Sequence, residues 1–294
     1  KDKPFFAYLA HYTPHIPYTA KKELIEKNKN AFEPVYAALI ETLDYTIGIL
    51  VKKLEELNLL NDTIIVFTSD NGGLHVPEGN HSRVTHNTPF RAGKGYTYEG
   101  GQRVPLIVRW PEHIPSGRVI DVPVNNTDWI PTLLELIGAE IPKGLDGVSF
   151  AKELTGGKSE KRKIFWHFPH YTNQGGRPSG AVRDGDWLYI EFYDTNTKEL
   201  YDLSVDIGEK EDLSARYPEI VNSLHNDLEE WKLAIKAQSN KPNPECIEDD
   251  FRNLYINFDP SSFNPLEASD EEWDKIRSWR IKMDEAVNKK RIKT

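Results

Sequence analysis

Two polar side chains that can bind a metal ion follow a run of apolar residues in the first third of the chain. Residues 63–67 are almost wholly apolar and β-branched, which is typical of a parallel strand covered on both faces. Asp70 and Asn71 follow, at the strand end where open α/β sheets bind ligands. Their oxygen atoms are hard donors, which suit Ca²⁺ or Mg²⁺ better than a thiophilic metal. Two glycines come next, so the backbone can turn sharply and let both side chains face one point.

A lysine between two glycines is a candidate anion-binding group. Lys94 stands in Gly93-Lys94-Gly95, on a loop that the backbone can bring close to an anion. Taken alone, this pattern favours a solvated loop lysine, and Asp70-Asn71 favours an ordinary strand-to-turn junction. The two motifs together, on one stretch of chain, favour a functional site.

Three motifs of this region resemble those of the type I sulfatases, in the alkaline-phosphatase-like superfamily. They are residues 69–73 (Ser-Asp-Asn-Gly-Gly), 87–95 (Asn-Thr-Pro-Phe-Arg-Ala-Gly-Lys-Gly) and 98–105 (Tyr-Glu-Gly-Gly-Gln-Arg-Val-Pro). The resemblance extends from Pro4 to about Pro244. It implies an α/β fold with part of a doubly wound sheet, followed by a small C-terminal α+β subdomain with a four-stranded antiparallel sheet.

The resemblance also implies roles for single residues. Asp70 and Asn71 are expected to hold Ca²⁺, with Mg²⁺ as the alternative. Lys94 is expected to neutralise a sulfate oxygen as charge builds, and Arg91 and Arg103 to bind substrate or brace the loop.

A histidine near the start of the chain is the expected partner of the leaving group. His15 lies in Pro14-His15-Ile16-Pro17, after residues 4–10, which we expect to form a buried strand. By resemblance, its imidazole points at the sulfate and donates a proton to the departing alkoxide. A histidine in a proline-stiffened turn is the alternative.

Other histidines are weaker candidates. His75, His81, Arg83 and His86 lie between the two motifs at spacings that match no zinc site, and we expect them at the rim of the site. Among them, His81 or His86 is a possible substrate contact. Further on, His167 and His170 are candidates for substrate binding, or else a structural pair.

The nucleophile of a type I sulfatase is missing from this chain. The family oxidises a cysteine or serine in a Cys/Ser-x-Pro-x-Arg motif to formylglycine, but Cys246, the one cysteine, lacks the proline and arginine. Residues 87–91 have Pro and Arg at the right offsets, but begin with an asparagine, which cannot be converted. The family's N-terminal pair of aspartate ligands is missing too. We therefore expect the C-terminal part of a longer sulfatase, inactive alone, with the formylglycine in the missing N-terminal part.

Periodicity predicts the elements that hold these residues. Helices are expected over residues 31–57 and 218–236. Two more are expected from a cap at Thr127 to before Gly138, and from a cap at Ser269, with Glu272 three residues on, to about 289. A strand is expected over 106–110. From Lys163 the pattern changes to short strands, expected over 164–168, 180–183, 187–193 and 199–202. The expected division is a catalytic α/β portion at 1–150, an antiparallel subdomain at 151–243 and a helical tail at 244–294.

Composition limits the partners. The 294 residues are 38% apolar with a net charge of −9, which is ordinary for a globular protein and argues against nucleic acid. No stretch reads as long and apolar enough to span a membrane. The resemblance implies a sulfated small molecule or sulfated carbohydrate as substrate and an extracytoplasmic location, periplasmic or secreted. Because a sheet without its leading strands has an open edge, pairing with an N-terminal fragment or self-association is also expected.

Two other functions stay open. A phosphomonoester or phosphonate hydrolase can use the same scaffold, and the absent nucleophile would decide between them. A non-catalytic, carbohydrate-binding or structural fragment is the third possibility.

Overall fold

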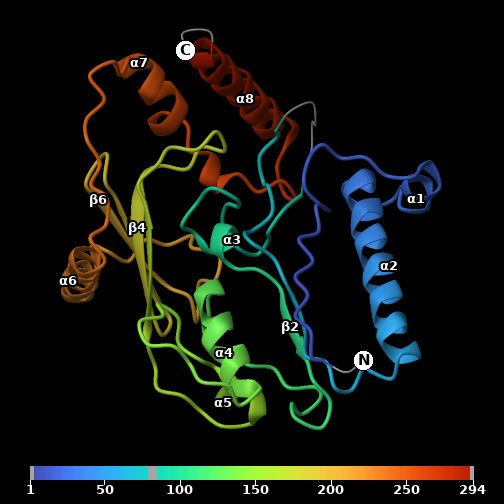
Figure 1. The fold of residues 1–294 in the computed structure, drawn as a ribbon. Helices are drawn as coiled ribbons and strands as arrows, with labels where there is room; N and C mark the ends of the chain where they lie inside the picture. Colours follow the sequence, from blue (N-terminus) through green and yellow to red (C-terminus); the bar gives the residue numbers. More distant parts are fainter. Residues whose placement is uncertain (1–2, 79–84, 292–294) are drawn as a thin grey trace.

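A computed structural model describes residues 3–78 and 85–291 of the chain (Figure 1). The fold is α/β, with helices beside a small two-stranded sheet in the first half and a four-stranded antiparallel sheet in the second. His81 and Arg83 lie outside the described residues. The division into three domains stays a prediction.

The small sheet differs from the expected parallel arrangement. Its strands β1 (Ile65–Thr68) and β2 (Leu106–Arg109) pair antiparallel, with Ile65 opposite Arg109 and Thr68 opposite Leu106. The residues of β1 are half-buried or exposed, so the prediction of a parallel strand covered on both faces was wrong. The physical reason is that, within the described ranges, this sheet has only two strands and its faces are only partly covered.

The expected strand at residues 4–10 was also wrong. This segment forms no regular element, and its large apolar side chains face solvent: Phe6 is 78% exposed and Tyr8 is 82% exposed. An apolar, β-favouring sequence becomes a buried strand only when a neighbouring strand supplies hydrogen bonds and cover.

The predicted long helix is present as α2 (Pro34–Glu56), with the short α1 (Lys22–Lys27) packed beside it. The Glu33 side chain caps α2 by accepting from the backbone N–H of Val35 at 3.2 Å. Contrary to the sequence expectation, α2 is by length and composition apolar enough to cross a membrane. The core helix of a water-soluble protein passes the same test, so this is weak evidence for a membrane.

The four-stranded sheet matches the prediction closely. It has the order β3 (Lys163–Phe168), β4 (Ser179–Asp184), β5 (Trp187–Phe192), β6 (Thr197–Asp202), each antiparallel to the next. The helix α6 (Pro218–Ala234) covers one face, where Val182, Leu200 and Leu228 are fully buried.

The opposite face of this sheet supports the loop that carries Lys94. Ala181, Leu188 and Ile190 pack there in one core with Tyr96 and Tyr98. The short helix α3 (Glu99–Gln102) follows directly and is buried at its first three residues. The four-stranded sheet therefore supports the loop that carries Lys94.

Two further helices lie between β2 and β3 in the sequence. A turn of 3₁₀ helix at Asn126–Asp128 leads into α4 (Trp129–Leu136), and α5 (Ala151–Thr155) follows. The capping residue is Asn125, through a reciprocal capping box with Asp128, not Thr127 as predicted. Gly138 ends the helix region with φ 68°, as its position predicted.

The C-terminal tail packs on the protein as a structural element. After α7 (Glu248–Phe251), a π-helical turn at Arg252–Ile256 and a 3₁₀ turn at Pro260–Ser262, the helix α8 (Asp270–Arg291) begins. The predicted cap is confirmed, because Ser269 and Glu272 exchange hydrogen bonds between backbone and side chain. Trp273, Ile276, Trp279 and Met283 of α8 are buried against Val76 and Leu254.

Candidate active site

His15 and Lys94 meet on the surface of the folded chain. Lys94 Nζ lies 3.1 Å from His15 Nε2, although 79 residues separate them in sequence. His15 Nδ1 lies 2.7 Å from the carbonyl oxygen of Ile16, which can only accept, so Nδ1 carries the ring proton. Nε2 is then the unprotonated nitrogen and accepts a hydrogen bond from the Lys94 ammonium group. The structure thus brings together two residues that the resemblance placed in one site.

The turn around His15 is held by its own backbone. The N–H of His15 donates to the carbonyl of Tyr12 at 2.9 Å, and the Tyr12 hydroxyl donates to Ile16 O. These bonds fix the ring at the end of the exposed segment, beside Lys94.

Asp70 and Asn71 each keep one oxygen free. Asp70 Oδ1 accepts from the N–H of Asn71 at 3.0 Å and from the Ser69 hydroxyl at 3.4 Å. Asn71 Nδ2 donates to Gly72 O at 2.9 Å. Asp70 Oδ2 and Asn71 Oδ1 have no hydrogen-bond partner among the described residues. A carboxylate oxygen and an amide oxygen on consecutive residues suit a hard cation such as Ca²⁺, which takes oxygen ligands.

The loops that carry these side chains are in direct backbone contact. The N–H of Lys94 donates to Gly73 O at 3.0 Å, and the N–H of Gly72 donates to Gly101 O at 3.0 Å. A Cβ on Gly72 would lie 1.8 Å from Gly100 O, and one on Gly93 would lie 2.3 Å from Gly73 O. Only glycine allows this approach, so the glycines of the motifs join the two loops.

Arg91 and Arg103 brace the loop. Arg91 donates to the Tyr201 hydroxyl at 2.9 Å and to the Ser261 hydroxyl at 2.8 Å, and its guanidinium lies 4.0 Å from the centre of the Tyr98 ring. Arg103 forms an ion pair with Glu99 at 2.7 Å. Of the two roles expected for these arginines, their contacts support the structural one.

His75 is a buried residue, so the prediction of a rim position was wrong. It is 1% exposed, and its Nε2 donates to the carbonyl of Pro260 at 3.0 Å. Burial lowers the pKa of His75 to about 4. The reason is long-range: the tail around Pro260 covers this part of the loop, which local sequence does not reveal. His86 is half-buried, and its ring lies edge-on to Phe32 at 5.3 Å.

The two subdomain histidines differ in their contacts. Both nitrogens of His167 are used, by the Tyr193 hydroxyl at 2.8 Å and by Gln238 O at 2.9 Å. His170 is exposed and contacts only Phe168 by its ring, within the part of the chain that the structure describes. His170 stands on the loop between β3 and β4, whose Gly176 approaches Gly95 so closely that a Cβ on Gly176 would lie 1.8 Å from Gly95 O. This loop therefore borders the Lys94 loop.

A cluster that sequence reasoning missed lies under α6. Ligand atoms of Glu191, His225 and Glu229 lie within 4.8 Å of one another. Lys232 Nζ lies 2.6 Å from Glu229 and 3.5 Å from Glu191, so an ammonium group already occupies the cation position. The spacing of His225 and Glu229 on one helix face was the available signal. The contacts fit an ionic network that fastens α6 to β5.

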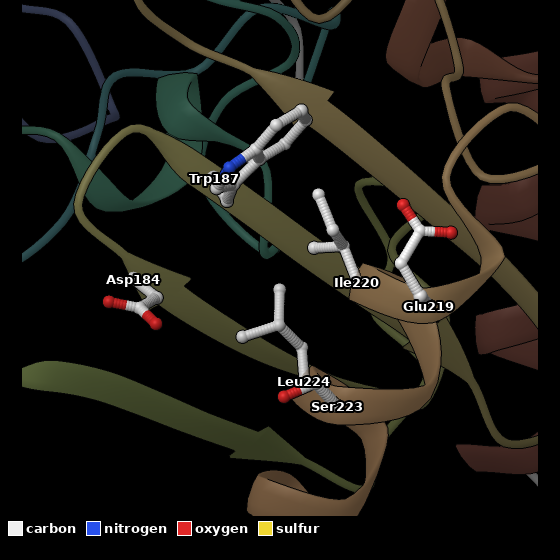
Figure 2. A pocket seen from close by; sticks show the side chains of 6 residues that line it. All are labelled: Asp184, Trp187, Glu219, Ile220, Ser223 and Leu224. Atoms are coloured by element: carbon white, nitrogen blue, oxygen red, sulfur yellow. The ribbon is translucent and has the colours of Figure 1, made fainter.

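Two hollows in the described part of the chain have linings that do not include His15, Asp70 or Lys94. One, of about 280 Å³, lies between the hairpin at Asp184–Trp187 and the start of α6 (Figure 2). The other, of about 310 Å³, is lined by His75, Arg91 and Glu209 among others. His15 and Asp70 are exposed and Lys94 is half-buried, and none of the three lines either hollow.

Comparison with known proteins decides the family. The sulfatase family model matches residues 1–139, and the model of the C-terminal region of N-sulphoglucosamine sulphohydrolase matches residues 92–234. The chain belongs to the sulfatase family. Its fold is therefore the alkaline-phosphatase-like fold that the sequence motifs implied.

Individual relatives agree with this assignment. A sulfatase of Formosa agariphila is 34% identical over 80% of this chain and 47% of its own length. Human arylsulfatase A is 33% identical over 76% of this chain and 48% of its own. The solved structure of Ps i-CgsB with k-i-k-neocarrahexaose has 33% identity and a TM-score of 0.67, over 79% of this chain and 50% of that one. The sulfatase chain spans about half the length of the curated relatives it matches.

Proposed function

We propose that this chain supplies part of the active site of a sulfuric ester hydrolase. The observation that carries the proposal is the contact between Lys94 and His15 beside the joined loops that carry Asp70 and Asn71. A lysine ammonium group, an imidazole and two free hard oxygens are the groups that a sulfate ester needs around it.

Each residue has a distinct role in the proposal. Asp70 Oδ2 and Asn71 Oδ1 hold the cation. The Lys94 ammonium group binds one sulfate oxygen and offsets its charge. Once the Lys94 ammonium group turns to the sulfate, the freed Nε2 of His15 takes up a proton from solvent and passes it to the oxygen of the departing alcohol, while the Nδ1–H bond to Ile16 keeps the ring oriented. When bound, Ca²⁺ withdraws charge from the sulfate, and a formylglycine outside this chain supplies the nucleophile.

The substrate class is a sulfated carbohydrate or a sulfated small molecule. The similar structure of Ps i-CgsB is a complex with k-i-k-neocarrahexaose, which supports a sugar. His170 lies on the loop whose Gly176 borders the Lys94 loop and is a candidate sugar contact, whereas His167 is already engaged on both nitrogens. An extracytoplasmic location, periplasmic or secreted, is part of the same proposal.

The initial rates of hydrolysis of a sulfate ester and of the matching phosphate ester test this function. The protein that contains this chain, or this chain mixed with an N-terminal fragment, is assayed on 4-nitrophenyl sulfate and 4-nitrophenyl phosphate. Faster sulfate hydrolysis is expected, with none from the chain alone. Preferential phosphate hydrolysis would favour the phosphoesterase alternative, and sugar-sulfate binding without turnover would favour a non-catalytic fragment.

A further inference from the structure

Asn87 uses its whole carboxamide to join the two loops of the site. Its Oδ1 accepts from the N–H of Gly73 at 3.0 Å. Its Nδ2 donates to Gly73 O at 2.8 Å and to Ala92 O at 3.0 Å. The acceptor and both donor hydrogens of one side chain are therefore engaged with backbone, on both loops.

The carbonyl of Gly73 is the meeting point of these bonds. It accepts from Asn87 and also from the backbone N–H of Lys94, at 3.0 Å. The two loops are closely packed at this point, because a Cβ on Gly93 would lie 2.7 Å from Asn87 Nδ2 and 2.3 Å from Gly73 O. Asn87 thus ties the backbone two residues after Asn71 to the backbone two residues before Lys94.

We propose that Asn87 is a positioning residue that sets the spacing between the cation-binding oxygens of Asp70 and Asn71 and the ammonium group of Lys94. The inference rests on the proposed function, since it gives both loops a common task. A sulfate held between a cation and an ammonium group needs both at a fixed separation, and a misplacement of about 1 Å can cost on the order of 100-fold in rate. Asn87 itself touches neither substrate nor reacting atoms in this proposal.

The chemistry of the three bonds explains why an asparagine is required. Aspartate has nearly the same shape, but it has no hydrogen to donate and would place a carboxylate against the carbonyls of Gly73 and Ala92. Alanine removes all three bonds. Glycine-to-alanine substitution at Gly93 gives an independent route to the same effect, because the added Cβ pushes the loops apart with Asn87 intact.

Amide hydrogen exchange tests whether Asn87 holds the two loops together, without metal or substrate. The variants are Asn87→Ala, Asn87→Asp and Gly93→Ala, with Asn222→Asp as a control that adds the same charge at an exposed position of α6. Exchange at Lys94 is expected to rise about tenfold or more in the first three, because its bond to Gly73 O opens more often. Exchange at Gly73 is expected to rise as well in Asn87→Ala, which removes its acceptor. The control is expected to match wild type. If Asn87→Ala does not fold, the near-isosteric Asn87→Asp takes its place.

Calorimetric titration with CaCl₂ tests the consequence for the site. The calcium Kd is expected to rise about tenfold in Asn87→Ala, as is typical when a residue that orients metal ligands is lost. In the active protein, kcat is expected to fall more than KM rises. A wild type that binds calcium and an Asn87→Ala variant that binds it equally well would overturn the inference and leave the proposed function standing. A wild type that binds no calcium would count against the proposed function. In that case, unchanged exchange at Gly73 and Lys94 would by itself overturn the positioning role of Asn87.

Discussion

Nε2 of His15 accepts a hydrogen bond from Nζ of Lys94 at 3.1 Å. The two residues are 79 positions apart in sequence, one on an exposed turn and one on a loop supported by the four-stranded sheet. Their contact puts an ammonium group and a basic nitrogen at one point on the surface.

Removing either side chain is expected to lower turnover in different ways. In the active protein, Lys94→Ala is expected to lower kcat/KM on an aryl sulfate by about 10²–10³-fold, because charge on the sulfate is left uncompensated. His15→Ala is expected to cost about 10²-fold on alkyl sulfates but much less on nitrophenyl sulfate, whose leaving group needs no proton. Lys158→Ala, an exposed control, should change neither rate. Equal losses on both esters for His15→Ala would contradict its role as proton donor.

The buried His75 is expected to make stability depend on acid. Burial lowers the pKa of His75 to about 4, against about 6.5 in an unfolded chain. Between these two pKa values the unfolded chain binds a proton that the folded chain does not. The contribution of His75 to the free energy of unfolding is therefore complete above about pH 6.5, and it falls by about 3 kcal/mol as the pH drops to 4. Urea unfolding at pH 7 and pH 5 measures this loss.

His75→Gln should flatten the pH dependence, since glutamine does not titrate and can still donate to Pro260 O. His113→Gln, at an exposed position, serves as the control. An unchanged pH dependence in His75→Gln would show that another group is responsible.

Glu209 is expected to act in the opposite direction. It is 1% exposed and accepts from the N–H of Glu99 at 3.0 Å, and burial raises its pKa well above the ordinary value. The folded chain then retains a proton that the unfolded chain loses, so stability falls as the pH rises through the folded pKa. Glu209→Gln should raise the free energy of unfolding at pH 8 by on the order of 1 kcal/mol and have less effect at pH 5. The control Glu219→Gln, at an exposed position, should leave the free energy of unfolding unchanged at both pH values. A lower free energy of unfolding for Glu209→Gln at pH 8 would refute this account.

The exposed apolar segment at residues 4–10 is expected to drive association of the isolated chain. Phe6 and Tyr8 are 78% and 82% exposed, and Ile107 of the neighbouring small sheet is 62% exposed. Multi-angle light scattering should therefore give a mass above 33.7 kDa that rises with concentration. The double variant Phe6→Ser, Tyr8→Ser should shift it toward the monomer. A wild type that stays monomeric at every concentration would contradict the expectation.

Local patterns predicted much of this structure. The four antiparallel strands, α2, α6 and the Ser269 cap follow from alternation, helical periodicity and capping chemistry, all of which act over a few residues. The pairing of His15 with Lys94 was implied by family resemblance and not by spacing, because 79 residues lie between them.

Long-range packing explains the rest. The partial exposure of β1, the burial of His75 behind Pro260 and the ionic network of Glu191 with His225 depend on which distant segments meet. The role of Asn87 was hidden for the same reason, since an asparagine before a turn is ordinary until its three backbone partners are known.

A crystal structure of the protein with Ca²⁺ and sulfate tests the central claim most directly. The account predicts anomalous density for the cation between Asp70 Oδ2 and Asn71 Oδ1, and a sulfate within hydrogen-bond distance of Lys94 Nζ and His15 Nε2. Calcium bound only at Glu191, His225 and Glu229, or sulfate bound away from Lys94, would contradict it.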